Sequence, residues 1–108
     1  MKKLTVVFIS DPGHGWVKIS REKLIKLGIA RKISSYSYQR AGWVFLEEDC
    51  DAALLIKTCE LLKIKLVIKN KTPARNSSKI RNYQRFALTW TEQQELGTQI
   101  TETNTYTG

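Results

Sequence analysis

Apolar positions along the first quarter of the chain predict two strands followed by a short helix. Leu4 to Ile9 is a continuous and largely β-branched apolar run, which is typical of a buried strand. Residues 16–19 predict a second strand. Ser20 then suits the N-cap of a helix, and Gly28 suits the left-handed position that follows a helix. The first part of the chain therefore reads as β-β-α.

The apolar pattern changes three more times before the chain becomes polar. Residues 33–39 alternate serine with tyrosine, which predicts a strand, and 40–42 form a turn into a further strand at 43–46. Residues 52–63 place their apolar side chains on one helical face, as in a helix packed on a sheet. Residues 65–69 predict the last strand of the core.

The order of these elements, β-β-α-β-β-α-β, predicts an α+β fold with a small, mainly antiparallel sheet and two helices. A chain of 108 residues with 42% hydrophobic residues suits a single domain, which we place at residues 1–86. Residues 87–108 read as an acidic, threonine-rich tail with the composition of a disordered segment. The apolar run after Met1 is too short for a signal peptide, so we expect a cytoplasmic protein.

The two cysteines and the single histidine argue against a structural metal site. Cys50 and Cys59 lie nine residues apart, or about 13 Å along one helix, which is too far for a disulfide. We therefore expect free thiols. The spacing matches no zinc motif, so we expect neither a metal nor a cofactor.

Charge is distributed unevenly along a chain whose formal net charge is +8. Residues 87–108 contain acidic residues and no basic one, whereas residues 65–86 contain basic residues and no acidic one. The basic residues of that segment are Lys65, Lys69, Lys71, Arg75, Lys79, Arg81 and Arg85. This asymmetry predicts a cationic surface that meets either nucleic acid or the acidic surface of a protein.

The stretch SDPGHGW, residues 10–16, contains the only histidine between two glycines. It reads either as a tight turn or as a nest of backbone N–H groups that binds an anion. In a third interpretation Asp11 orients His14 for catalysis. The candidate ligand-binding residues are Asp11, Gly13, His14, Gly15 and Trp16.

Two further clusters each have a structural and a functional interpretation. The acidic run 47–51 either binds a divalent cation or, as we favour, begins a helix with Asp49 as the capping residue. Tyr36, Tyr38 and Trp43 are either core residues or an exposed platform for stacking on bases or on a protein.

Several motifs resemble a family of small uncharacterised proteins carried by bacterial phages and plasmids. The motifs are SDPGHGW, WVKISREKLIKLGI, ISSYSYQ, LEEDCDA and KIRNYQRF, and the resemblance covers most of residues 5–86. It implies a mobile-element setting inside a bacterial host cell, where small proteins often block host defence. The opening GWVKIS to LGI is also similar to swapped-hairpin transcription regulators and antitoxins, although here ISSYSYQ follows.

These observations predict a non-enzymatic protein that docks through a basic surface on a host defence or nucleic-acid-handling complex as an inhibitor, or on nucleic acid directly. The residues expected to contact the partner are Tyr36, Tyr38, Lys69, Lys71, Arg75, Lys79, Arg81, Tyr83 and Arg85. One alternative is a binding protein or hydrolase for a nucleotide or another small phosphorylated ligand, centred on Asp11 and His14. The other is a DNA-binding regulator. We favour binding over catalysis because no nucleophile or metal cluster is evident.

Overall fold

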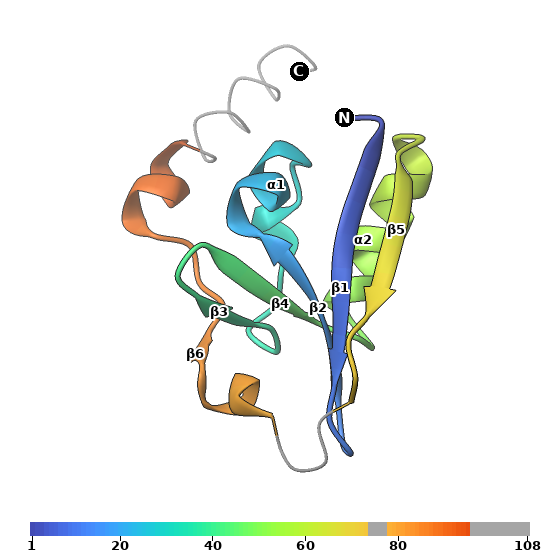
Figure 1. Cartoon of the computed structure of the whole chain (residues 1–108). Helices are drawn as coiled ribbons and strands as arrows, with labels where there is room; N and C mark the ends of the chain where they lie inside the picture. Colours follow the sequence, from blue (N-terminus) through green and yellow to red (C-terminus); the bar gives the residue numbers. More distant parts are fainter. Residues whose placement is uncertain (74–77, 96–108) are drawn as a thin grey trace.

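The computed structural model, which describes residues 1–73 and 78–95, contains one mixed sheet of six strands in the order β5-β1-β2-β4-β3-β6 (Figure 1). β5 runs parallel to β1, and the other neighbouring strands are antiparallel. The strands are β1 (Lys3–Ser10), β2 (Gly15–Ser20), β3 (Tyr38–Arg40), β4 (Trp43–Glu47), β5 (Lys65–Asn70) and β6 (Gln84–Arg85).

The structure has two α-helices, α1 (Arg21–Lys26) and α2 (Asp51–Leu61). It also has two 3₁₀ helices, η1 (Ala30–Lys32) and η2 (Lys79–Asn82), and a further helical stretch at 90–95. The predicted α+β class is confirmed. The predicted order and the number of helices differ in detail, because β6, the 3₁₀ helices and the stretch at 90–95 were not expected. The sheet is mixed rather than purely antiparallel because β5 returns alongside β1 after α2.

Both ends of α1 are formed by the residues that the sequence predicts. The Ser20 side chain accepts a hydrogen bond from the Lys23 backbone N–H at 3.2 Å. Gly28 has a φ of 77° and donates to the carbonyl of Ile25 at 3.0 Å, while the next N–H donates to the carbonyl of Leu24 at 3.3 Å. These paired bonds satisfy carbonyls that would otherwise be left unpaired at the end of the helix.

The beginning of α2 corrects the prediction that Asp49 caps this helix. Cys50 occupies the N-cap position, and no side chain donates or accepts a capping hydrogen bond there. Asp51 is buried instead, and its carboxylate accepts hydrogen bonds from the backbone and hydroxyl of Ser34 and from the hydroxyl of Ser37. Both cysteines are free thiols, as expected.

Asp51 also explains why the predicted strand at 33–39 is mostly absent. The two serines that bind its carboxylate are held in a turn, so the chain becomes extended only at Tyr38. The serine–tyrosine alternation therefore does not place the tyrosines on one strand face. Tyr36 is 66% exposed in the turn, whereas Tyr38 is half-buried at the start of β3.

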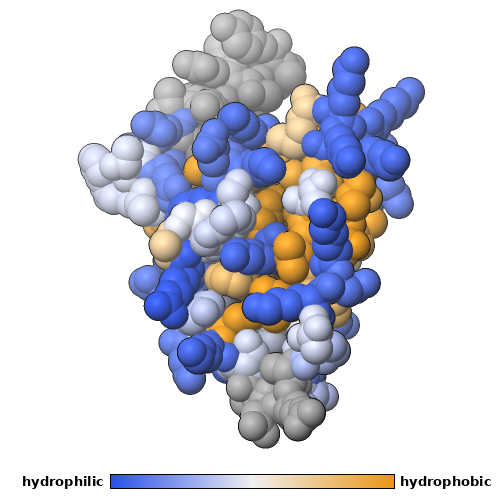
Figure 2. Space-filling model, in the orientation of Figure 1, coloured by the Kyte–Doolittle hydropathy of each residue, from blue (hydrophilic) through white to orange (hydrophobic). Residues whose placement is uncertain are grey.

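The two faces of the sheet have separate hydrophobic clusters. The larger core lies between the sheet and the helices and includes Leu4, Val17, Leu24, Val44 and Leu55. α2 lies behind β1 and β5 in Figure 1, so Figure 2 shows the face opposite that helix, with apolar surface bordered by hydrophilic side chains. A smaller cluster made by Trp16, Phe45 and Ile80, with Ile9, Tyr38 and Tyr83 packed against it, occupies this second face.

Residues 87–95 contact the rest of the domain through charged and apolar groups. The Arg21 guanidinium binds both carboxylate oxygens of Glu92, at 2.8 and 2.6 Å, and this pairing lowers the pKa of Glu92 from 4.5 to about 2. Thr89 and Glu92 exchange reciprocal capping bonds at the start of the helical stretch, and Leu88 packs against the larger core. The remainder of the predicted tail, including Thr98–Gly108, lies outside the described residues.

Candidate ligand pocket and cationic sheet face

The loop between β1 and β2 is organised around the buried carboxylate of Asp11. This carboxylate accepts hydrogen bonds from the backbone N–H groups of Gly13 and His14, both at 3.0 Å, and of Ser78 at 2.8 Å. The Arg81 guanidinium donates two more, from Nε at 2.7 Å and from Nη2 at 2.8 Å. Arg81 thereby holds the pKa of Asp11 well below its usual range, and Asp11 raises the pKa of Arg81 in return.

This arrangement changes the interpretation of the DPGHG turn. The N–H groups that could form an anion-binding nest already bind the carboxylate of Asp11. Asp11 contacts the backbone of His14 rather than its imidazole, so it does not orient the ring as the catalytic interpretation requires. The two glycines are needed because a side chain at either position would clash with its neighbours. A Cβ at Gly13 would lie 2.7 Å from Arg81 Nη2, and one at Gly15 would lie 2.4 Å from the Phe8 ring.

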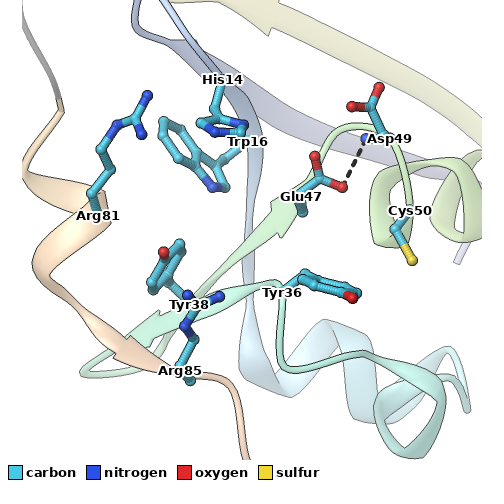
Figure 3. Close-up of a pocket in the computed structure, with 9 residues that line it drawn as sticks. All are labelled: His14, Trp16, Tyr36, Tyr38, Glu47, Asp49, Cys50, Arg81 and Arg85. Atoms are coloured by element: carbon cyan, nitrogen blue, oxygen red, sulfur yellow. Dashed lines mark hydrogen bonds between the residues drawn. The ribbon is translucent and has the colours of Figure 1, made fainter.

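A pocket of about 450 Å³ lies beside this loop and draws on four segments that are far apart in the sequence (Figure 3). It is lined by His14, Trp16, Tyr36, Tyr38, Glu47, Asp49, Cys50, Arg81 and Arg85. Each of the motifs SDPGHGW, ISSYSYQ, LEEDCDA and KIRNYQRF contributes at least two of these residues. The structure therefore brings together features that the sequence left as separate clusters.

One wall of the pocket is aromatic and carries two guanidinium groups. The rings of His14 and Trp16 are 6.0 Å apart, and those of Trp16 and Tyr38 meet edge to face at 6.4 Å. The guanidinium of Arg85 lies 4.8 Å from the centre of the Tyr38 ring, and that of Arg81 lies 5.9 Å from that of Trp16. Cation–π contacts of this kind hold both guanidinium groups against the aromatic wall.

The indole N–H of Trp16 is an unused donor at the pocket. The residue is only 2% exposed, yet its N–H meets no acceptor within the described part of the chain. In Figure 3 the indole nitrogen of Trp16 faces the space between the aromatic rings and Glu47. Trp16 is also one of the residues that line the pocket. A ligand with an acceptor atom could therefore pair with it.

The two ends of the pocket carry opposite charges. Figure 3 shows Arg81 and Arg85 at one end and Glu47, Asp49 and Cys50 at the other, with the aromatic rings between them. Glu47 Oε2 accepts from the Asp49 backbone N–H at 3.0 Å, which fixes the carboxylate at the acidic end. The arrangement suits a ligand with a flat ring, an anionic group on one side and hydrogen-bond donors on the other.

The other residues predicted to contact a partner lie away from this pocket. Lys71, Lys79 and Tyr83 line a second cavity of about 470 Å³, together with Lys18, which the sequence analysis did not single out. Lys69 is exposed on β5, and Arg75 lies outside the described residues. Trp43 is 44% exposed, so this member of the aromatic cluster is a surface residue.

In the part of the chain that the structure describes, no group of three or more His, Cys, Asp or Glu side chains could hold a metal ion. Within the same residues, no helix has both the length and the apolar character needed to cross a membrane. Comparisons with models of protein families, with curated proteins and with solved structures found no match. The resemblance to phage- and plasmid-borne proteins therefore stays a prediction.

Proposed function

We propose that this chain is a non-enzymatic binding protein that takes up a nucleotide in the pocket between the β1–β2 loop and η2. The observation that carries the proposal is the order of groups across the pocket: guanidinium groups, then aromatic rings, then carboxylates. A nucleotide has the complementary order, because a phosphate and a base with hydrogen-bond donors stand at opposite ends of one molecule.

The phosphate belongs at the arginine end. Arg81 uses Nε and Nη2 on Asp11, which leaves Nη1 without a partner among the described residues. Arg85 donates one hydrogen bond, from Nη1 to the Ser35 carbonyl at 3.1 Å, and pairs with no carboxylate in the described ranges. Guanidinium groups bind phosphate oxygens through charge-assisted and often bidentate bonds, and His14 adds a third polar group there.

The base belongs against the aromatic rings, with its edge toward the acidic end. Tyr36 offers an exposed ring, and Tyr38 forms part of the aromatic wall. The carboxylates of Glu47 and Asp49 can accept hydrogen bonds from an exocyclic amino group, which guanine, adenine and cytosine carry and uracil lacks. The pocket should therefore bind guanosine, adenosine and cytidine monophosphates more tightly than uridine monophosphate.

Binding is favoured over hydrolysis by the way the candidate acid–base residues are used. Asp11 is fully engaged by backbone N–H groups and by Arg81, and the His14 imidazole has no carboxylate partner in the described residues. A general base needs a group that orients it, and Asp11 does not serve His14 in that way. If the resemblance to mobile-element proteins holds, the protein would withdraw a nucleotide from a host defence system in the bacterial cytoplasm.

Calorimetric titration with guanosine, adenosine, cytidine and uridine monophosphates tests the proposal. Arg85→Ala removes a cation whose only described hydrogen bond is to an exposed carbonyl, so the fold should be retained. We expect saturable binding to the intact protein and an affinity at least tenfold lower for Arg85→Ala, by analogy with the loss of charge-assisted bonds. Lys57→Ala, an exposed cation on α2, is the matched control. An absence of heat with all nucleotides would refute the proposal, as would equal affinities for the two variants.

A further inference from the structure

The sheet face opposite the helices carries a continuous row of side chains that spans all six strands. Residues paired directly across neighbouring strands lie on the same face. The pairings Lys69–Val7, Val7–Lys18, Lys18–Phe45, Phe45–Tyr38 and Tyr38–Arg85 therefore define a single row from β5 to β6. Cations stand at both ends of the row, as Lys69 on β5 and Arg85 on β6, and at Lys18 on β2, the third strand from the β5 edge.

The second cavity deepens the middle of this face and is lined by three lysines. Lys18 enters it from β2, Lys71 from the end of β5 and Lys79 from η2. Its apolar floor comes from the smaller hydrophobic cluster, which contributes Phe45 and Ile80. Among the described residues, no carboxylate lines it. A cavity with three ammonium groups and no acid attracts an anion such as a phosphate group.

Aromatic rings on the same face carry cations beside them. The ammonium group of Lys18 lies 4.3 Å from the centre of the Trp43 ring, which is 44% exposed. The guanidinium of Arg40, which pairs with Trp43 across β3 and β4, lies 5.0 Å from the centre of the Tyr83 ring. When a base stacks on such a ring, the phosphate of the same nucleotide lies close to the cation beside that ring.

Within the described residues, the cations of this face form no ion pair with a carboxylate of the protein. The ion pairs in the described ranges are Arg21–Glu92, Lys26–Glu22 and Arg81–Asp11, and none of them includes Lys18, Lys69, Lys71, Lys79 or Arg40. The acidic residue in the paired positions of this face is Glu47, opposite Trp16 at the nucleotide pocket. The lysine cavity is therefore available to an anionic partner.

We propose that this face binds single-stranded nucleic acid, with phosphates over Lys18, Lys71 and Lys79 and a base stacked on Trp43. An exposed indole can stack on an unpaired base, and the bases of a duplex are not free to stack in this way. The rings beside Lys18 and Arg40 favour a nucleic acid over an acidic protein surface, because charge alone would be enough to attract the protein. The proposal goes beyond the nucleotide pocket and does not depend on it, because the two cavities share no lining residue.

Fluorescence anisotropy with a labelled oligo-dT of about 15 nucleotides, a length that spans such a site, tests this proposal. We expect Lys71→Glu/Lys79→Glu to weaken binding by more than tenfold at about 100 mM salt. The matched control Lys32→Glu/Lys57→Glu makes the same change of charge on η1 and α2, and should weaken binding much less. Log affinity decreases with log salt, and over about 50 to 300 mM salt this decrease should be less steep in Lys71→Glu/Lys79→Glu. The magnitude of the slope should be smaller by about 1.4, or about 0.7 for each lost phosphate contact.

Equal losses in the two double variants would overturn the proposal, because net charge alone would then explain binding. Trp43→Ala, a surface change, should weaken oligo-dT binding by about tenfold. An unchanged affinity would show that no base stacks on Trp43. Tighter binding of a duplex or of poly-L-glutamate at matched ionic strength would assign the face to another class of partner. Guanosine monophosphate should still bind Lys71→Glu/Lys79→Glu, so failure of this proposal and failure of the nucleotide pocket are distinguishable.

Discussion

Arg81 Nε and Nη2 donate hydrogen bonds of 2.7 and 2.8 Å to the two carboxylate oxygens of Asp11, across 70 positions of the sequence. The carboxylate is inaccessible to solvent, and the arginine side chain is 33% exposed. This pair fastens η2 to the β1–β2 loop, and η2 contributes Arg81 to the proposed nucleotide pocket and Lys79 and Ile80 to the lysine cavity. The Asp11–Arg81 pair therefore helps to hold in place a segment that contributes residues to both cavities.

Arg81→Ala should destabilise the protein markedly because it leaves the buried carboxylate of Asp11 without its cation. We expect the thermal midpoint to fall by roughly 5 to 15 °C, as when one partner of a buried pair is removed from a small domain. Differential scanning fluorimetry of Arg81→Ala beside Arg85→Ala measures this effect. Arg85 is exposed and binds no carboxylate in the described residues, so the thermal midpoint of Arg85→Ala should stay within a few degrees of the parent value. Equal midpoints for the two variants would contradict the role given to Asp11.

Stability should decline in acid because two carboxylates have lowered pKa values in the folded state. For such groups the stabilising contribution is complete above the unfolded-state pKa and is lost as the pH falls through the folded-state pKa. The contribution of Glu92 should therefore be complete above pH 4.5 and disappear as the pH approaches about 2. Asp11, whose pKa is lower still, should lose its contribution only below pH 3.8.

Urea denaturation at a series of pH values measures this dependence. Glu92→Gln should flatten the decline below pH 4.5, because the variant cannot lose the pairing of a carboxylate with Arg21. Glu22→Gln, which alters an exposed pair with Lys26, is the control and should follow the parent curve. A parent curve that is flat down to pH 2 would contradict the account.

Ser37→Ala should cost about 1 to 3 kcal/mol of unfolding free energy, because it leaves two buried groups short of a partner. The Ser37 hydroxyl donates to Asp51 and accepts from the Glu47 backbone N–H at 3.0 Å. Ser35→Ala, at an exposed position in the same turn, should have almost no effect. Chemical denaturation monitored by circular dichroism gives both values, and similar losses would show that the Asp51 network does not hold this turn.

The two cysteines should differ in their rates of alkylation. Cys50 is exposed at the pocket, whereas burial shields Cys59 and raises the pKa of its thiol. Because the thiolate is the reactive form, iodoacetamide should modify only Cys50 in the native protein and both cysteines after unfolding. Guanosine monophosphate should slow the modification of Cys50 if it occupies the pocket. Mass spectrometry of the native protein that finds Cys59 labelled as fast as Cys50 would contradict the fold.

Features specified by neighbouring residues could be predicted from the sequence. Ser20 and Gly28 delimit α1 because a cap depends on bonds within a few positions, and the run from Leu4 to Ile9 identifies a strand because its burial is continuous. The short helix at 90–95 carries the same kind of signal in Thr89 and Glu92, a capping-box spacing that the sequence analysis overlooked.

Features specified by remote contacts could not be predicted. Nothing near Asp11 indicates that its partner is Arg81, and nothing in the serine–tyrosine alternation indicates that Asp51 would bend it into a turn. The segment containing Ile80 and Tyr83 appears polar, yet these two residues cover the second face of the sheet. The sequence therefore supplied most residues of the pocket, and the tertiary contacts decided which of them meet.

The indole N–H signal of Trp16 in a ¹H–¹⁵N correlation spectrum tests the central claim most directly. The chain has three tryptophans, Trp16, Trp43 and Trp90, and Trp43→Phe and Trp90→Phe assign their signals. Titration with guanosine monophosphate should shift the Trp16 signal progressively to saturation and leave the other two in place, because the Trp16 N–H opens onto the proposed pocket. A Trp16 signal that does not move at millimolar nucleotide, or a shift confined to Trp43 or Trp90, would contradict the account.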